Sequence, residues 1–242
     1  RGNNQLLAEL YQQLVENLPR REDWRYTASL TSLGNAYYSL GRYQEAIAFH
    51  EQSLDIDRDI GDRQGEATSL NNLGIAYRSL GRYQEAIAVY EQSLDIKRDI
   101  GDRGGEATSL MNLGNAYDSL GRYQEAIAVY EQSLEIQRSI GDKRGEANTL
   151  LVLGNSYQKV GRVQEGFAAS QQATAIYQDL NLPLDAYPYP KWLKKLVKFA
   201  QRGKFHLILC CLGGLVAFPL AVVWLISLIL YRLIRRRFNP HS

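Results

Sequence analysis

The chain has 242 residues, with 28 lysines and arginines, 26 acidic residues and a formal net charge of +2. The charge is divided, because residues 1–185 carry every acidic residue against 18 basic ones, whereas residues 186–242 carry ten basic residues and no acidic one. We expect an acidic body to bind no nucleic acid, whereas a basic tail suits an anionic surface. Three histidines and two cysteines are too few for a histidine-dependent catalytic site or a zinc cluster, so we expect no enzyme, no metal and no cofactor.

A unit of forty residues is repeated along the body of the chain. Residues 70–109 and 110–149 differ at only ten of forty positions. The segment LGNAYYSLGRYQEAIAFHEQSL at residue 33 returns with few changes at residues 73 and 113, and a more divergent copy begins at residue 153. Ala8 lies forty residues before Ala48, which predicts a helix over residues 5–17 from an incomplete earlier repeat. We therefore place this partial repeat at 1–25 and a repeat domain over 26–180, with units at 26–64, 65–104, 105–144 and 145–180.

Each unit is expected to form two helices joined by a short turn. In the second unit, apolar residues recur at helical spacing in two successive segments, which predicts helices over residues 66–80 and 84–100. Gly81 and Gly101 follow these segments, and glycine takes the left-handed conformation that ends a helix without steric cost. The predicted buried residues are Leu70, Leu73, Tyr77 and Leu80 in the first helix and Ala86, Ile87, Tyr90 and Leu94 in the second.

The repeat also resembles a known family. The spacing of Leu33, Gly34, Tyr37 and Ala46 recurs forty and eighty residues later and resembles the tetratricopeptide repeat. The length of the unit and its IGDRxGEA connection are similar to the kinesin light chain and LGN/Pins types. A lone hairpin leaves an apolar face uncovered, so the units must stack. The resemblance implies an all-α, right-handed superhelical stack whose concave groove binds a protein or peptide partner.

Two stripes of residues run along the first helix of each unit, about 140° apart at the angular spacing of an α-helix. One stripe is the predicted core, and the resemblance implies that the other, through Asn71, Ile75 and Arg78, lines the groove. Four of the ten differences between the two most similar units lie on this second stripe, although exposed positions without a packing role also vary easily. Asparagine amides there can donate to and accept from a peptide backbone. The predicted groove residues are Asn35, Tyr38, Asn71, Asn72, Ile75, Arg78, Met111, Asn112, Asn115, Asp118 and Asn155. The RYQEA sequence at each turn is interpreted as hairpin architecture.

The C-terminal part of the sequence predicts a membrane attachment. Residues 181–190 contain three prolines and are expected to form a stiff, extended spacer. Residues 191–204 are predicted to form a basic amphipathic helix that lies on lipid headgroups. Its membrane-surface residues are Trp192, Lys194, Lys195 and Lys198.

Residues 205–231 carry no formal charge and are long enough to cross a bilayer as a single C-terminal transmembrane helix. A basic tail follows at 232–242. Six basic residues precede the span and four follow it, so the charge rule places the repeats on the cytoplasmic side by a small margin. Gly213, Gly214 and Pro219 interrupt the run, so a re-entrant hairpin is the alternative topology.

The sequence therefore predicts a membrane-anchored scaffold that binds a protein or peptide partner, with membrane lipids as a second partner. One alternative is a self-assembling module, because near-identical units allow association of copies into a homo-oligomer. The other is the regulatory part of a longer enzyme or signalling protein, since the chain begins at Arg1 rather than at methionine and is expected to be a fragment.

Overall fold

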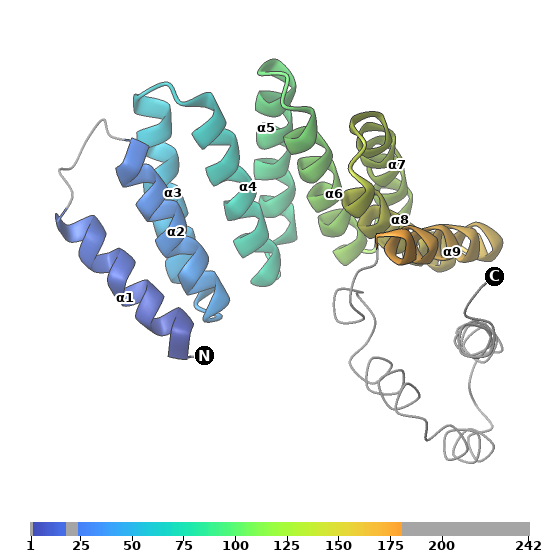
Figure 1. The fold of residues 1–242 in the computed structure, drawn as a ribbon, viewed down its shortest axis with the longest axis horizontal. Coiled ribbons are helices and arrows are strands. Elements are labelled where there is room, and N and C mark those ends of the chain that lie inside the picture. The colour runs from blue at the N-terminus through green and yellow to red at the C-terminus, as the bar shows by residue number, and fades with distance from the viewer. Residues whose placement is uncertain (1, 18–23, 181–242) are drawn as a thin grey trace, which may run out of the picture. The chain divides into compact units, whose positions relative to one another are not determined.

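The computed structural model describes residues 2–17 and 24–180, and every secondary-structure element within these ranges is an α-helix (Figure 1). Even-numbered helices are the first helices of the hairpins, and odd-numbered helices are the second helices. The helices are α1 (Gly2–Asn17), α2 (Trp24–Ser39), α3 (Tyr43–Asp59), α4 (Arg63–Ser79), α5 (Tyr83–Asp99), α6 (Arg103–Ser119), α7 (Tyr123–Ile140), α8 (Lys143–Lys159) and α9 (Val163–Asp179).

The first helices α4, α6 and α8 begin at aspartate caps. The carboxylate of Asp62 accepts a hydrogen bond of 2.9 Å from the backbone N–H of Gly65, and Asp102 and Asp142 do the same for α6 and α8. Such a cap pairs one of the backbone donors left open at a helix start. Helix α4 therefore begins at Arg63, three residues earlier than the apolar spacing predicted.

Glycines in the left-handed conformation separate the helices, as the sequence predicted. Gly81 has φ +78° and Gly101 has φ +71°. In the turn after Gly81 the Arg82 guanidinium lies 4.5 Å from the centre of the Tyr77 ring and pairs with Glu85. The Tyr77 hydroxyl donates to Glu51 of the preceding repeat at 3.2 Å. The same arrangement recurs at Arg122 and Arg162, and these contacts of the RYQEA turn lie within the stack.

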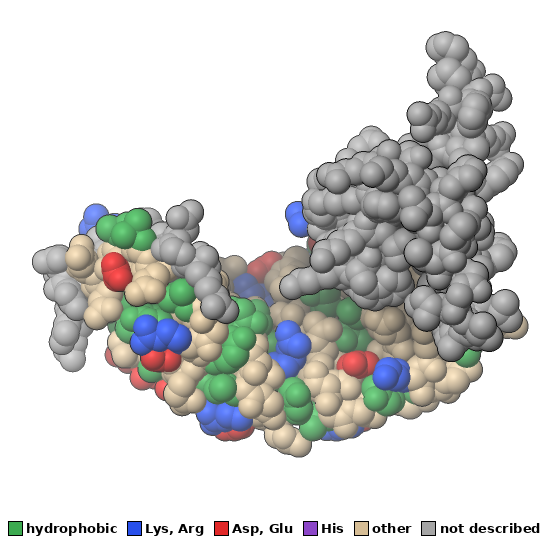
Figure 2. All heavy atoms as spheres, turned by 90° about the horizontal axis from the view of Figure 1, so that it is seen from below, with side chains coloured by type: hydrophobic (Ala, Val, Ile, Leu, Met, Phe, Trp, Pro, Cys, Tyr) green, Lys and Arg blue, Asp and Glu red, His purple; other side chains and the backbone are tan. Residues whose placement is uncertain are grey.

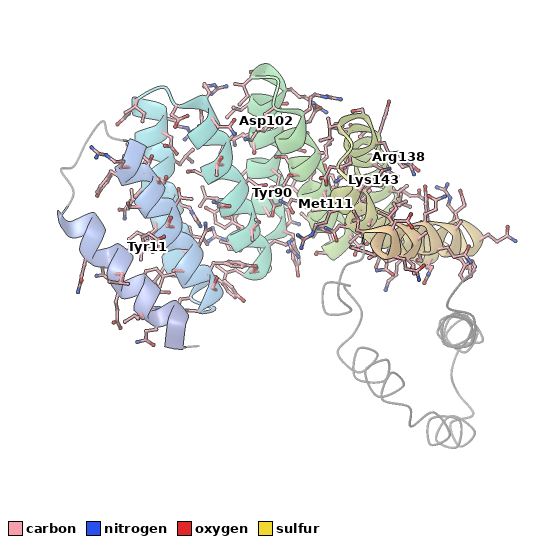
Figure 3. All side chains as sticks on the ribbon, viewed as in Figure 1. Tyr11, Tyr90, Asp102, Met111, Arg138 and Lys143 are labelled. Atoms are coloured by element: carbon pink, nitrogen blue, oxygen red, sulfur yellow. The ribbon has the colours of Figure 1, made fainter. Side chains whose placement is uncertain are left out.

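Within each hairpin a ring from the second helix packs on a glycine of the first. A Cβ built on Gly74 would lie 2.4 Å from Cε1 of Tyr90, and one on Gly114 would lie 2.5 Å from Cε1 of Tyr130. Figure 3 shows Tyr90 in the hairpin of α4 and α5. Both tyrosines are fully buried, so glycine permits the close approach of the two helices. The predicted core residues of the second unit are buried, except Tyr77, which is half-buried, and Leu80, which follows the end of α4 and is exposed.

Polar side chains form a second layer where successive repeats meet. Ser93 is fully buried, donates to the backbone carbonyl of Ala67 at 2.8 Å and lies 3.2 Å from the hydroxyl of Ser109. Ser53 and Ser69 occupy the same places one repeat earlier. These hydroxyls are satisfied within the stack, so their burial carries little penalty.

Helix α1 packs against α2 as the second helix of an incomplete repeat, but its register differs from the prediction by one residue. The Tyr37 hydroxyl donates to Gln12, 25 residues earlier, whereas the equivalent bonds in the later repeats span 26 residues. Ala8 is buried in the core next to Leu33, whereas Ala48 is exposed. Ala8 thus takes the place of Ile47.

The predicted spacer, amphipathic helix, transmembrane segment and basic tail (181–190, 191–204, 205–231 and 232–242) lie outside the described residues. Trp192, Lys194, Lys195 and Lys198 lie outside them as well. Among helices α1 to α9, none combines the length and the apolar character that a membrane crossing requires.

Candidate functional site

The first helices of successive repeats lie side by side. Helix α2 contacts α4, α4 contacts α6 and α6 contacts α8, whereas the second helices in the described part of the chain do not approach one another in the same way. A stack with this asymmetry curves toward its first helices, which therefore form the inner face. The predicted groove residues all lie on these helices, and we call them the inner stripe.

The inner stripe is less open than the sequence suggested. Asn35 and Asn155 are exposed, Asn112 is buried, and the other stripe residues are half-buried. Asn112 donates from Nδ2 to Oδ1 of Asn71 on the neighbouring helix at 2.9 Å. This pair of amides holds α4 and α6 together, so the buried amide of Asn112 is used inside the stack, and its role toward a ligand stays a prediction.

Two further hydrogen bonds cross between first helices. The hydroxyls of Tyr38 and Ser79 lie 3.0 Å apart and connect α2 with α4. Ser156 donates to Oδ1 of Asp118 at 2.8 Å and connects α8 with α6. Ser79 and Ser156 were not among the predicted site residues. Serine does recur at 39, 79 and 119, directly after the stripe, and this was the available signal for Ser79; Ser156 replaces the alanine of the other repeats and had no such signal.

In the third repeat a buried tyrosine on the second helix, α7, contacts the stripe on the first helix, α6. The Tyr130 hydroxyl donates to Oδ1 of Asn115 at 2.7 Å. In the second repeat Ile75 replaces this asparagine, and the Tyr90 hydroxyl is buried without a hydrogen-bond partner. Burial raises the pKa of both tyrosines far above the usual value, so both phenols stay protonated.

Arg78 lies beside these tyrosines without an acidic partner. Its Nε is buried and makes no hydrogen bond, and no ion pair joins it to another described residue. Its charge nevertheless acts on both hydroxyls, since it lowers the pKa of Tyr90 and Tyr130 against the larger opposing effect of burial. Arg78 Nε and the Tyr90 hydroxyl are both buried, and neither atom has a hydrogen-bond partner among the described residues.

In the first repeat a histidine stands where Tyr90 and Tyr130 stand later. His50 is buried against Gly34, and its Nδ1 has no hydrogen-bond partner. Burial lowers the pKa of His50 to about 4, so the ring is neutral at physiological pH. A buried, neutral histidine of this kind is a core residue rather than a catalytic base.

The inner stripe therefore offers amides, one guanidinium and one carboxylate along a line of packed helices. Within residues 2–17 and 24–180, no cluster of three or more histidine, cysteine or acidic side chains could hold a metal ion. Figure 3 places Met111 on α6 beside α8 and Asp102 at the connection of α5 to α6. Met111 belongs to the stripe, whereas Asp102 caps a helix at the end of the hairpin.

Comparisons with known proteins agree with this architecture. A family model described as Tetratricopeptide repeat matches residues 26–99 and 105–179, which is more than half of the chain. A search of curated proteins finds no match.

Solved structures share the fold. BtubC (BKLC) from P. vanneervenii is 24% identical over 78% of this chain and 78% of its own, with a TM-score of 0.67. A proposed kinesin light chain from Podosopora anserina with nearly identical TPR-like repeats is 27% identical over 75% of this chain and 90% of its own, with a TM-score of 0.61. A Rap protein complexed with competence and sporulation factor is 18% identical over 74% of this chain and 51% of its own, with a TM-score of 0.62.

Proposed function

Because this chain belongs to the tetratricopeptide repeat family, we propose that it is a scaffold which binds a peptide or protein partner along the inner stripe. The stack supplies a rigid row of first helices, and repeat proteins of this architecture use such an extended inner surface for recognition. We assign the chain no catalytic step.

The observation that carries the proposal is a set of polar groups on the stripe that have no amide or charge partner within the described chain. Asn35 and Asn155 expose amides that bond to no described residue. Arg78 and Asp118 belong to adjacent helices and form no ion pair within the described chain. Figure 2 shows acidic, basic and apolar side chains interspersed on the face in view, without a large area of one sign. The amides and the two opposite charges of the stripe suit an extended polypeptide better than nucleic acid.

A protein with the same fold supports a binding role. The Rap protein, of which this chain spans about half, was solved in complex with competence and sporulation factor. The shared fold does not identify the partner of this chain.

The second part of the proposal places the scaffold at a membrane. The motive is the sequence of residues 205–231, which is uncharged and long enough to span a bilayer, and the basic segment before it. We expect alkaline carbonate to leave the full chain in the membrane fraction, because burial of apolar surface does not depend on ionic strength. Release by carbonate would overturn the anchor and leave the scaffold proposal intact.

The binding role can be tested with the full chain in detergent micelles and a displayed library of random peptides. Peptides selected by the wild type should bind Asn35→Ala/Asn155→Ala at least about tenfold more weakly, a loss of about 1.4 kcal/mol. Neither side chain is bonded within the described chain, so the melting temperature should stay within a few degrees. Gln52→Ala/Gln92→Ala, exposed on α3 and α5, is the matched control. Equal loss in both double variants, or no selected peptide, would refute binding at the stripe.

Self-association is a second candidate, favoured by an apolar face on α1. Leu6 and Leu10 lie one turn apart and are 59% and 56% exposed. Exposed leucines at helical spacing can pack against another copy. Mass measurement of the solubilised chain and of Leu6→Ser/Leu10→Ser tests this, and a wild-type monomer would exclude it.

A further inference from the structure

Arg78 differs from the other arginines near the hairpin turns in having no acidic partner. Arg82, Arg122 and Arg162 each pair with the glutamate three residues later. Arg78 makes no ion pair within the described chain, is half-buried and has a buried Nε without an acceptor. A guanidinium carries five donors in a planar fork that matches a carboxylate. Its most favourable missing partner is therefore an acidic group that is supplied by a ligand.

Asp118 presents the opposite charge at the same position of the next repeat. Its Oδ1 accepts from Ser156, and no basic side chain of the described residues pairs with the carboxylate. Asp118 is half-buried on α6, directly after Arg78 on α4 in the order of the inner stripe. Arg78 and Asp118 lie forty residues apart, at the same position of two first helices that contact one another.

The two charges define a spacing along a ligand. Packed helices lie about 8 to 10 Å apart, and an extended chain advances about 3.3 Å per residue. A peptide that crosses from α4 to α6 therefore passes about three residues between the two positions. We infer that the inner stripe selects an extended segment with an acidic side chain against Arg78 and a basic side chain against Asp118, about three residues apart and in one fixed order.

This inference rests on the proposed binding function and commits to internal side chains rather than to a chain terminus. Exposed amides lie on both sides of the charged pair, with Asn35 on α2 and Asn155 on α8. Amides that can bond to peptide backbone before and after the pair indicate that the ligand continues in both directions. An acidic or basic side chain inside the segment fits this arrangement, and a terminal carboxylate does not.

The test is peptide selection with the wild type and with the charge-exchanged variant Arg78→Asp/Asp118→Arg, both as full chains in detergent micelles. The probe is a displayed random library with blocked termini. Wild-type peptides should be enriched in one order of opposite charges about three residues apart, and the exchanged variant should enrich the reverse order. Each protein should bind the other's peptides more than about tenfold more weakly, because like charges then face one another.

Two milder variants keep the inference testable if the exchange disturbs folding. Arg78→Gln should lose the preference for the acidic residue alone, and Asp118→Asn should lose the preference for the basic residue alone. Asp95→Arg, an exposed charge reversal on α5 outside the stripe, should keep the wild-type preference.

The outcomes separate the inference from the function on which it rests. Enriched peptides without a charge pattern, or with a pattern that the exchange leaves unchanged, would overturn the inference while binding stands. Enrichment that appears only when the peptide C-terminus is free would assign Arg78 to a terminal carboxylate and would also overturn it. No enrichment by the wild type would overturn both the inference and the proposed function.

Discussion

Tyr130 on α7 donates a hydrogen bond of 2.7 Å to Asn115 on α6, and the equivalent Tyr90 faces Ile75 and has no acceptor. The two rings occupy the same place over Gly114 and Gly74 and are equally buried. The chain thus contains a satisfied and an unsatisfied copy of one interaction. Asn115 therefore belongs both to the inner stripe and to the packing of the hairpin, because truncating it would remove the acceptor of the buried Tyr130 hydroxyl.

Removing the two hydroxyls should have unequal effects on stability. Tyr130→Phe leaves the Asn115 oxygen without its donor and should lower the free energy of unfolding by about 1 kcal/mol or more. Tyr90→Phe removes a buried hydroxyl that has no partner, so it should be neutral or stabilising. Denaturant unfolding of the full chain in micelles, followed by circular dichroism at 222 nm, measures both. Equal losses would show that Tyr90 has an acceptor after all.

Much of the fold could be predicted from the sequence because it repeats. Helical spacing identified Leu70, Leu73 and Tyr90 as buried, and the glycines at 81 and 101 marked the helix ends. The starts of the first helices were missed, because an aspartate cap such as Asp62 extends a helix beyond its apolar pattern.

The site could be predicted only in outline. The sequence predicts a stripe on the first helices whose binding role stays a prediction, but the bond from Asn112 to Asn71 depends on how neighbouring repeats pack against each other. Periodicity within one helix carries no information about the distance between side chains on neighbouring helices. The buried hydroxyl of Ser93 was missed for a related reason, since serine on an apolar face does not reveal its partner.

The junction between the first and second repeats should become more stable if Asp57 is replaced by lysine, the residue that occupies the equivalent position 97 in the next repeat. Asp57 is buried, and its burial raises the pKa of its carboxyl group. The hydrogen bond from Ser69 lowers this pKa, and the nearby charge of Asp62 raises it further, so that the net shift is upward. At the matching place Lys97 donates to Asp102 at 2.8 Å and lowers the pKa of Asp102 to about 2. Asp57→Lys should therefore raise the free energy of unfolding at pH 7 by roughly 1 to 3 kcal/mol.

The pH dependence gives this prediction its check. A carboxyl whose pKa is raised by folding contributes stability in acid, and that contribution is lost as the pH rises through the folded pKa. The advantage of Asp57→Lys over the wild type should therefore grow between pH 4 and pH 7 in denaturant titrations. Asp57→Asn, which removes the charge without adding a cation, should show a smaller gain with the same trend. A constant difference between wild type and Asp57→Lys across this range would contradict the assignment.

His50 should make the first repeat sensitive to acid. Folding lowers its pKa from 6.5 to about 4, so the unfolded chain binds the proton first and stability is lost as the pH falls through this window. The largest loss is roughly 3 kcal/mol at 1.36 kcal/mol per pKa unit. His50→Tyr, which copies Tyr90 and Tyr130, should remove that component, and its hydroxyl can reach toward Asn35 as Tyr130 does toward Asn115. Thermal melts at pH 4.5 and pH 7.5 compare the two proteins, and parallel losses would rule out His50 as the cause.

Two glycines on α6 should respond in opposite directions to the same substitution. A Cβ on Gly114 would lie 2.5 Å from Cε1 and 2.7 Å from Cδ1 of Tyr130, whereas the nearest atom to a Cβ on Gly104 is 3.8 Å away. Gly104→Ala should stabilise the chain by about 0.5 kcal/mol, because alanine loses less backbone entropy in a helix. Gly114→Ala should cost about 1 to 3 kcal/mol, since the buried ring has to move and with it the hydrogen bond to Asn115. Adding Tyr130→Ala to Gly114→Ala should make the two changes non-additive, because the smaller side chain accommodates the new methyl group. Stabilisation by both alanines would mean that α6 and α7 are not held at this close approach.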